Sequence, residues 1–349
     1  MKKLKDIELK GKKVLIRCDF NVAMEDGEIV EEIRIEKSLN TIKHALERGA
    51  EKVVLVSHLG RPKGQRLPEL SLEPIREKLK EFLEMEIGLL DNLDNLDNFL
   101  RQNSHNRLAL LENIRYWEEE KANNPAFAEK IAGNFDVYVN DAFSASHRAH
   151  ASIAGFPQHS REKAAGLLFE KEFEELSWAK DNPEKPAAAV IGGAKIDTKL
   201  PVIRSLEENY DQVLVGGKVA NEALDGKLEF SENVYFPEDF SPADKKEQRL
   251  DIGKKTVDVY IEKISKARSI IWNGPMGKFE DDDCQFGTKE IINAIIENTN
   301  AYTIIGGGET LEAVNRFSSL DHFDYVSMSG GAMLEFLGGK ELPGIEALK

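Results

Sequence analysis

Arginine and histidine side chains recur directly after short apolar runs in the first half of the chain. Arginine binds phosphate or carboxylate through two parallel hydrogen bonds, so a group of arginines could bind a small polyanion. An aspartate and an asparagine in the same group indicate a ligand that also carries hydroxyl groups. Each arginine alone is most simply explained as a surface or ion-pair residue, but the group as a whole favours a binding site. Its members are Asp19, Asn21, Arg34, His58, Arg61, Arg115, His147, Arg148 and His150.

Glycine-rich turns take the place of these charged residues in the second half. GGAK (192–195) and GGGET (306–310) each follow an apolar run and open a predicted helix. Backbone N–H groups at such turns bind phosphates, helped by the positive end of the helix. Close packing of a helix on a strand also requires glycine. Lys195, Lys199 and Glu309 beside these turns favour a nucleotide and metal site. The letters match neither a Walker A motif nor GxGxxG.

Short apolar runs predict the strands that position both groups. Their apolar residues are consecutive rather than alternating, which is typical of strands buried on both faces of a parallel sheet. Helix-like segments separate them, so the order of elements predicts the α/β class with doubly wound sheets. Ligands of such sheets bind beyond the carboxyl ends of the strands, where both groups lie. The runs are 14–16, 53–56, 108–111, 137–139, 187–191, 213–215, 269–272, 302–305 and 325–328.

The change from charged to glycine-rich loops divides the chain into two parts. It falls near 167–180, a long helical segment that is followed by Pro183 and Pro186. We therefore expect two doubly wound, Rossmann-like domains joined by an interdomain helix. The predicted boundaries are 1–164 for the first domain, 165–186 for the helix and hinge, and 187–334 for the second domain.

Composition excludes several classes of protein. The 349 residues carry a net charge of −15, from 47 basic and 62 acidic side chains, which is opposite to the balance of a nucleic-acid-binding surface. Two distant cysteines, Cys18 and Cys284, cannot form a disulfide framework or a multi-cysteine metal cluster. No apolar run approaches the ~20 residues that span a bilayer, and no signal peptide is recognisable. We expect a cytoplasmic monomer that binds small molecules and neither nucleic acid nor membrane.

Eight motifs, in order and nearly from end to end, resemble the phosphoglycerate kinase family. They are RCDFNV (17–22), VVLVSHLGRPKG (53–64), LLENIRY (110–116), YVNDAFSASHRAH (138–150), GGAKIDTK (192–199), WNGPMGKFE (272–280), IGGGET (305–310) and SGGAMLEFLGGKELPGIEAL (329–348). The resemblance implies reversible phosphoryl transfer between 1,3-bisphosphoglycerate and ADP, giving 3-phosphoglycerate and ATP in glycolysis. It also implies Mg²⁺, ADP or ATP as co-substrate, and in-line transfer on domain closure without a covalent intermediate.

The resemblance also implies a role for residues at matching positions. The first domain would bind phosphoglycerate, with the C-terminal tail from about 335 to 349 packed back on it, and the second would bind nucleotide. The catalytic residues would be Arg34, Lys199, Gly307 and Gly308. The phosphoglycerate site would comprise Asp19, Phe20, Asn21, Arg34, His58, Leu59, Gly60, Arg61, Arg115 and Arg148. The nucleotide site would comprise Gly193, Ala194, Lys195, Lys199, Gly216, Asn273, Pro275, Glu280, Gly307, Gly308, Glu309 and Thr310, with Glu309 also holding Mg²⁺.

Four positions depart from the family pattern. Glu309 stands where aspartate is usual, Lys218 replaces a third glycine, 219–250 is shorter than usual, and Lys254 replaces a proline. Glu309 and Lys218 leave open a catalytically impaired paralogue that still binds a ligand. A dinucleotide-dependent oxidoreductase is a second alternative, but it would require GxGxxG with an acidic residue ~20 positions later. A non-enzymatic scaffold is a third, but it gives no reason for cations to gather at strand ends.

Overall fold

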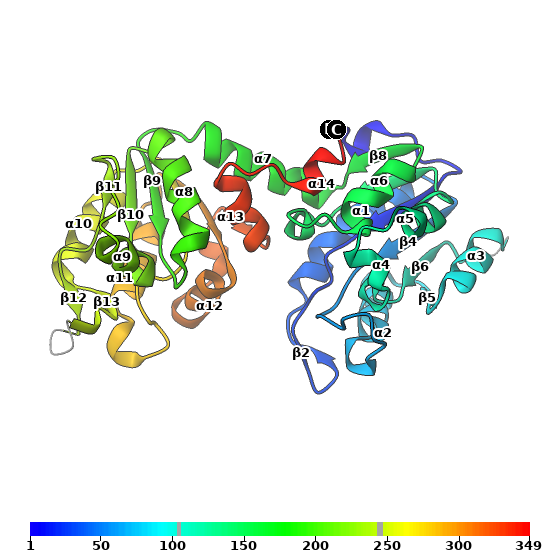
Figure 1. The fold of residues 1–349 in the computed structure, drawn as a ribbon, viewed down its shortest axis with the longest axis horizontal. Coiled ribbons are helices and arrows are strands. Elements are labelled where there is room, and N and C mark those ends of the chain that lie inside the picture. Colours follow the sequence, from blue (N-terminus) through cyan, green and yellow to red (C-terminus); the bar gives the residue numbers. More distant parts are fainter. Residues whose placement is uncertain (103–105, 243–246) are drawn as a thin grey trace. The chain divides into compact units, whose positions relative to one another are not determined.

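The computed structural model describes residues 1–102, 106–242 and 247–349 and divides the chain into two compact units. The first unit comprises Met1–Phe173 and Glu341–Lys349, and the second comprises Glu174–Lys340. Each contains a six-stranded, all-parallel sheet with flanking helices (Figure 1), which confirms the predicted α/β class. The boundary between the units falls within helix α7 (Leu167–Asp181).

The sheet of the first unit has the strand order β5-β6-β4-β1-β7-β8. Its register pairs Arg17, at the end of β1, with Val56 of β4 and Asn140 of β7. The residues that follow these three strands therefore leave the sheet at one edge. The strands are β1 (Lys13–Arg17), β4 (Lys52–Val56), β5 (Gly88–Leu90), β6 (Leu108–Leu111), β7 (Val137–Asn140) and β8 (Glu162–Ala165).

Helices of the first unit bury one apolar face against this sheet. In α3, for example, Leu96, Phe99 and Leu100 are buried, and the Asn92 side chain caps the helix by accepting a hydrogen bond from Asn95 N at 2.9 Å. The helices are α1 (Ile33–Glu47), α2 (Glu73–Leu83), α3 (Leu93–Arg101), α4 (Glu118–Lys121), α5 (Pro125–Ala132), α6 (Phe156–His159) and α14 (Pro343–Glu346). Short helical turns are η1 (Leu4–Asp6), η2 (Pro68–Leu70), η3 (Ile114–Tyr116), η4 (Phe143–Ala145) and η5 (Ala151–Gly155), and β2 (Met24–Glu25) pairs with β3 (Glu28–Ile29).

The last nine residues of the chain belong to the first unit. Gly344 N donates to Ser146 O at 2.9 Å, and Lys163 Nζ donates to Ala347 O at 2.8 Å. Leu342, Ile345 and Leu348 are buried. This segment thus packs beside the loop that follows β7.

The sheet of the second unit has the order β11-β10-β9-β14-β15-β16. Its strands are β9 (Ala187–Ile191), β10 (Gln212–Val215), β11 (Val234–Tyr235), β14 (Ser269–Asn273), β15 (Tyr302–Gly306) and β16 (Tyr325–Ser327). Its helices are α8 (Ile196–Asn209), α9 (Gly217–Asp225), α10 (Lys254–Ile264), α11 (Phe286–Glu297), α12 (Gly308–Phe317) and α13 (Gly331–Leu337), with turns η7 (Asp282–Cys284) and η8 (Leu320–His322). A separate antiparallel pair is formed by β12 (Phe240–Ser241) and β13 (Asp251–Ile252).

All nine predicted strands are present. The strands that were not predicted are β5, β8 and β11, at edges of the six-stranded sheets, and the short strands of the two-stranded sheets, β2, β3, β12 and β13. The three edge strands are partly exposed, so their sequences lack a long apolar run. None of the described helices is long and apolar enough to cross a membrane.

Candidate functional site

The predicted phosphoglycerate-site residues lie in one unit, next to the carboxyl ends of four neighbouring strands. Residues 19–21 follow β1, residues 58–61 follow β4, Arg115 lies in η3 after β6, and Arg148 follows η4 after β7. Arg34 comes from the first turn of α1. Hydrogen bonds join the loops; for example, Gly60 N donates to Asn21 Oδ1 at 2.9 Å, and Arg115 Nη1 donates to Gly60 O at 2.7 Å.

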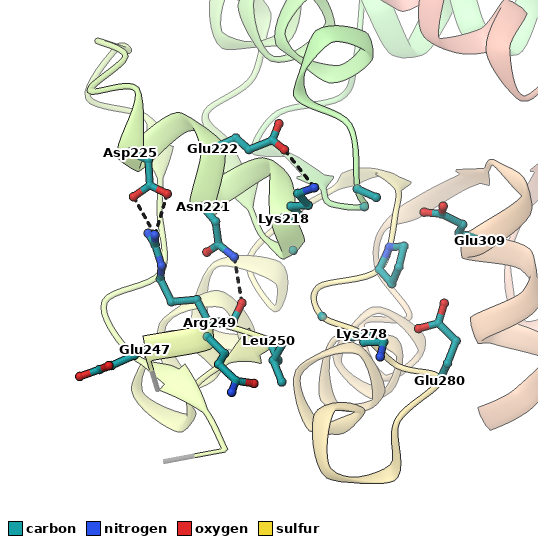
Figure 2. A pocket seen from close by; sticks show the side chains of 16 residues that line it. Lys218, Asn221, Glu222, Asp225, Glu247, Arg249, Leu250, Lys278, Glu280 and Glu309 are labelled. Carbon is teal, nitrogen blue, oxygen red and sulfur yellow. Dashed lines mark hydrogen bonds and ion pairs between the residues drawn. The ribbon is translucent and has the colours of Figure 1, made fainter. Parts of the chain in front are cut away.

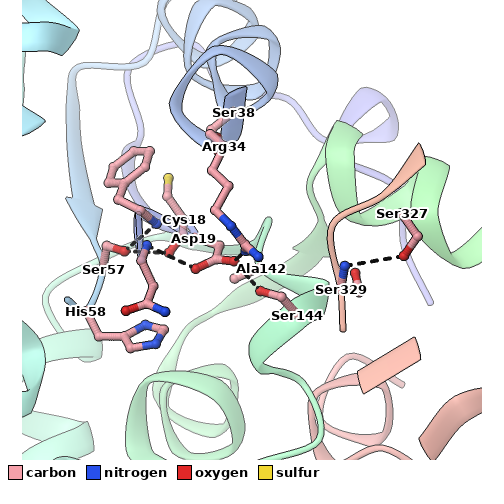
Figure 3. Close-up of polar contacts among 12 residues, drawn as sticks. Cys18, Asp19, Arg34, Ser38, Ser57, His58, Ala142, Ser144, Ser327 and Ser329 are labelled. Carbon is pink, nitrogen blue, oxygen red and sulfur yellow. Dashed lines mark hydrogen bonds and ion pairs between the residues drawn. The ribbon is translucent and has the colours of Figure 1, made fainter. Parts of the chain in front are cut away.

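Asp19 is the centre of a polar group shown in Figure 3. Its Oδ2 accepts hydrogen bonds from Arg34 Nη1, which also forms an ion pair, and from Ser144 Oγ at 2.5 Å. Its Oδ1 accepts from Asn21 N at 3.2 Å. Asp19 is buried while Asn21 is exposed. In this arrangement Asp19 fixes the position of the Arg34 guanidinium.

Four arginines lie close enough to repel one another. Burial, followed by the charges of Arg17 and Arg148, lowers the pKa of Arg115 to about 10, and Arg61 contributes in the same direction. In the part of the chain that the structure describes, none of Arg17, Arg61, Arg115 and Arg148 forms an ion pair with a carboxylate. Burial and these neighbouring charges also lower the pKa of His150 to about 4. The buried Glu120 carboxylate offsets part of this positive charge, and the excess favours the binding of an anion.

Two members of the predicted set contribute to packing instead. The side chains of Phe20 and Leu59 are 0% and 2% exposed and belong to the apolar core of the first unit. The side chains of these two residues are therefore not available to a ligand.

The predicted nucleotide-site residues lie at the carboxyl ends of neighbouring strands in the second unit. Residues 193–195 follow β9, Gly216 follows β10, Asn273 ends β14, and 307–310 link β15 to α12. Close backbone approach explains the glycines. Gly274 has φ +96°, and a Cβ there would lie 2.3 Å from the Gly192 carbonyl. Gly307 has φ +98°, and its Cβ would lie 2.8 Å from Asn273 Nδ2.

Asn273 and Thr310 hold these loops together. Asn273 Nδ2 donates to Gly306 O at 2.6 Å, and Gly274 N donates to Thr310 Oγ1 at 2.7 Å. Lys199, in the first turn of α8, donates from Nζ to Asn273 Oδ1 and to Asn273 O at 3.4 Å. Burial lowers the pKa of Lys199 to about 8, and the charge of Glu309 partly opposes this. The result is a buried cation with an amide partner beside the Gly307–Thr310 loop.

Two adjoining pockets run along these strand ends. The first, of about 450 Å³, contains Gly193, Pro275 and Glu280 of the predicted set (Figure 2). The second, of about 310 Å³, contains Lys195, Lys199, Asn273, Gly307, Gly308 and Thr310. Ala194 and Glu309 line both pockets. Together the two pockets can hold an elongated ligand, with its anionic end next to the lysines.

The sequence analysis missed one polar wall of the first pocket. Lys218, Asn221, Glu222 and Asp225 of α9 all line it. Their i, i+3, i+4, i+7 spacing on one helical face is the signal that could have found them. Arg249 faces them and binds both carboxylate oxygens of Asp225 at 2.7 Å (Figure 2).

Two further details concern Gly216 and Lys218 at this pocket. Gly217 rather than Gly216 lines it, because Gly216 packs against Met276, whose Sδ would lie 2.6 Å from a Cβ at residue 216. Lys218 lies at the rim, where its side chain is 66% exposed and Nζ is 3.5 Å from Glu222 Oε1. It therefore both borders the pocket and points to solvent.

Glu309 is the carboxylate that borders both pockets. Among the described residues, no group of three or more His, Cys, Asp or Glu side chains could hold a metal. Mg²⁺ commonly binds through one or two carboxylates together with substrate phosphates. The exposed Glu309 carboxylate, which borders both pockets, fits this kind of site.

Known proteins resemble the chain in both sequence and structure. A family model described as phosphoglycerate kinase matches residues 4–229 and 224–340. A phosphoglycerate kinase of Thermosipho africanus is 42% identical over 391 residues, covering 99% of this chain and 97% of the relative. One of Koribacter versatilis is 38% identical, covering 99% and 98%. The solved phosphoglycerate kinase from Coxiella burnetii has a TM-score of 0.87 at 34% identity, covering 99% of this chain and 98% of that one. The one from Pyrococcus horikoshii has a TM-score of 0.82 at 31%, covering 100% and 98%.

These matches extend over nearly the whole chain. The alignment of 391 residues with the Thermosipho relative exceeds the 349 residues of this chain, so it contains positions that this chain lacks. The two matched segments of the family model meet at 224–229, at the end of α9, which lies within the segment predicted to be shortened. The chain belongs to the phosphoglycerate kinase family, whose members are phosphotransferases.

Proposed function

We propose that this chain catalyses the glycolytic transfer of a phosphoryl group between 1,3-bisphosphoglycerate and ADP, giving 3-phosphoglycerate and ATP. The observation that carries the proposal is the group of arginines at the strand ends of the first unit, whose charge Glu120 offsets only in part, in a chain whose relatives are phosphoglycerate kinases. The adjoining pockets of the second unit, with a buried lysine beside a glycine loop, provide for the nucleotide.

Phosphoglycerate would bind across the loops of the first unit. His58, Arg61, Arg115 and Arg148 would bind its phosphate. These side chains lie near one another and supply hydrogen-bond donors and positive charge. Asp19 and Asn21 would bind the hydroxyl and carboxylate end. Arg34 would bind next to the transferred group, and for this it must exchange its contact with Asp19 for one with the substrate.

The nucleotide would bind along the two pockets of the second unit. Its base and ribose would occupy the first pocket, between Gly193 and Pro275 and next to Glu280. Its phosphates would occupy the second, next to Lys195 and the Gly307–Thr310 loop. Lys199 would stabilise the charge that develops on the transferring phosphoryl group, since phosphoryl transfer depends mainly on positioning and electrostatics.

Magnesium would complete the nucleotide site. Glu309 would hold Mg²⁺ together with phosphate oxygens, and the ion would neutralise part of the phosphate charge. The protein itself orients the two ligands for in-line attack by the carboxylate of phosphoglycerate, so no covalent enzyme intermediate is needed. Closure of the two units would bring the ligands into line. A cytoplasmic location and a monomeric state remain predictions.

The direct test is ATP-dependent phosphorylation of 3-phosphoglycerate in a coupled assay, with Mg²⁺ and with excess chelator. We expect turnover that requires ATP, 3-phosphoglycerate and Mg²⁺ together. A Lys199→Met variant serves as the negative control, because it removes the cation while keeping the length of the side chain. Tight binding of either ligand without turnover by the folded wild-type protein would instead support the catalytically impaired alternative.

A further inference from the structure

Arg17 is a buried arginine that the proposed reaction does not use. It ends β1 and is 1% exposed. Its Nε donates to Ser152 Oγ at 2.9 Å, one Nη donates to Cys18 O, and the other lies 2.9 Å from His58 Nδ1. Because a guanidinium has N–H donors and no acceptor, Arg17 is the donor in all three contacts.

This contact determines which nitrogen of His58 carries the proton. Nδ1 must accept from Arg17, so it bears the lone pair, and neutral His58 carries its hydrogen on Nε2. In the described part of the chain, Nε2 of His58 makes no hydrogen bond to another protein group. The His58 side chain can therefore offer an N–H donor to a ligand oxygen.

The charged surroundings of His58 also keep it neutral. Arg17 of β1, Arg115 of η3, and Arg148 and His150 of the loop after η4 face it. Burial first, and then these groups, lower the pKa of His58 well below its usual value. A neutral ring that already has a fixed tautomer needs no proton change when an anion binds.

A second set of contacts holds Arg17 in place. Ser152, in η5, donates from its backbone N to Glu120 Oε2 at 2.7 Å and from Oγ to Glu120 Oε1 at 2.6 Å. Since the single hydroxyl hydrogen of Ser152 goes to Glu120, its oxygen is free to accept from Arg17 Nε. Tyr138 fixes the Ser152 backbone by donating to its carbonyl at 2.7 Å. Glu120 is fully buried, so its acceptor atoms are held in a fixed place.

We propose that Arg17 is a positioning residue which, held by Ser152 and Glu120, fixes His58 as the Nε2–H tautomer and so supplies the phosphoglycerate site with an oriented N–H donor. This inference rests on the proposed function for the identity of the anion that His58 binds. The tautomer itself follows from the hydrogen-bond directions within the first unit.

The experiment is long-range ¹H–¹⁵N NMR of the histidine rings in the full chain between pH 5.5 and 8.5, with His58→Gln used to assign the signal. We expect wild-type His58 to show the Nε2–H pattern without titration. In Arg17→Met, His58 should populate both tautomers, and its pKa should rise while staying below the usual histidine value, because burial, Arg115 and Arg148 remain. The KM for 3-phosphoglycerate should rise about tenfold, as expected for losing one charge-assisted hydrogen bond, while kcat changes less than about threefold.

The matched control is Arg61→Met, which removes a cation from the same group without touching His58. It should raise the same KM but leave the His58 signal unchanged. If Arg17→Met does not fold, Ser152→Ala tests the same contacts and should broaden or split the His58 signal. A wild-type His58 that titrates normally or carries its hydrogen on Nδ1, or a tautomer unchanged in the folded variants, overturns the proposal. An enzyme without kinase activity but with the Nε2–H signal would contradict the proposed function and not the role of Arg17.

Discussion

Deprotonation of Lys199 should lower the catalytic efficiency of this enzyme at alkaline pH. Burial lowers the pKa of this lysine from 10.5 to about 8, which corresponds to ~3 kcal/mol against the charged form. Only the protonated lysine can stabilise the transferring phosphoryl group. In the free enzyme, kcat/KM for ATP should therefore fall above pH 8, by about tenfold for each further pH unit.

Bound nucleotide should shift the alkaline loss of activity to higher pH. The phosphates bring negative charge next to Lys199, and an opposite charge raises the pKa of an amine. Because kcat reports the enzyme–substrate complex, it should remain level to a higher pH than kcat/KM. The difference between the two profiles measures how strongly the phosphates interact with Lys199.

The assay is the coupled phosphorylation of 3-phosphoglycerate from pH 6.5 to 9.5, with coupling enzymes in excess at each pH. Lys199→Arg keeps a permanent charge and should abolish the alkaline fall at a reduced rate. Lys199→Met should lose at least ~10²-fold in kcat. Lys254→Ala is a control, because its exposed pair with Asp258 at 3.1 Å contributes little and it lines neither pocket. A kcat/KM that stays level to pH 9.5, or an alkaline fall that persists in Lys199→Arg, would refute this reasoning.

Three further predictions concern other residues. Arg34→Ala should lower kcat far more than it weakens ADP binding measured by calorimetry; an unchanged kcat would remove Arg34 from the transferring site. Glu309→Asp should keep activity within about tenfold or raise it, and complete loss would mean that the site depends on the longer side chain. Burial raises the pKa of Asp141 from 3.8 to about 7, so the folded state holds this proton more tightly. The stability it contributes is therefore present below pH ~4 and lost as the pH rises to 7, a change of ~4 kcal/mol. Asp141→Asn should flatten the Tm profile over this range in calorimetric scans, and a profile as steep as that of the wild type would contradict this.

The central strands and the loops after them could be predicted because burial on both faces leaves a clear pattern. KVVLV of β4 is buried at every position, and Ser57 and His58 follow its apolar run. Of the four edge strands of the six-stranded sheets, β16 was found in this way, but β5, β8 and β11 were not. β8 begins with the partly exposed Glu162 and Lys163, so it lacks a continuous apolar run.

Contacts between side chains that lie far apart in the sequence also could not be predicted. Phe20 and Leu59 stand within the motifs that carry the resemblance, yet their side chains pack in the core. Arg17 stands in the first of those motifs, but its importance depends on Ser152 and Glu120, which come from segments more than 100 residues away. Such contacts arise from tertiary packing, for which a single sequence has no local signal.

Arg17 and Lys199 are buried cations, one in each unit, and they share a feature that explains how each candidate site can attract anions. Arg17 donates to a hydroxyl, a ring nitrogen and a carbonyl, and Lys199 donates to the amide and carbonyl oxygens of Asn273. A carboxylate in these places would neutralise each cation, whereas neutral acceptors hold the side chain and leave its charge to act on a ligand. Arg34 differs, because Asp19 already neutralises it. Productive binding must therefore separate Arg34 from Asp19. Because Arg34 becomes available only in the complete complex, it stabilises the charge that develops during the reaction and does not strengthen binding of the free ligand.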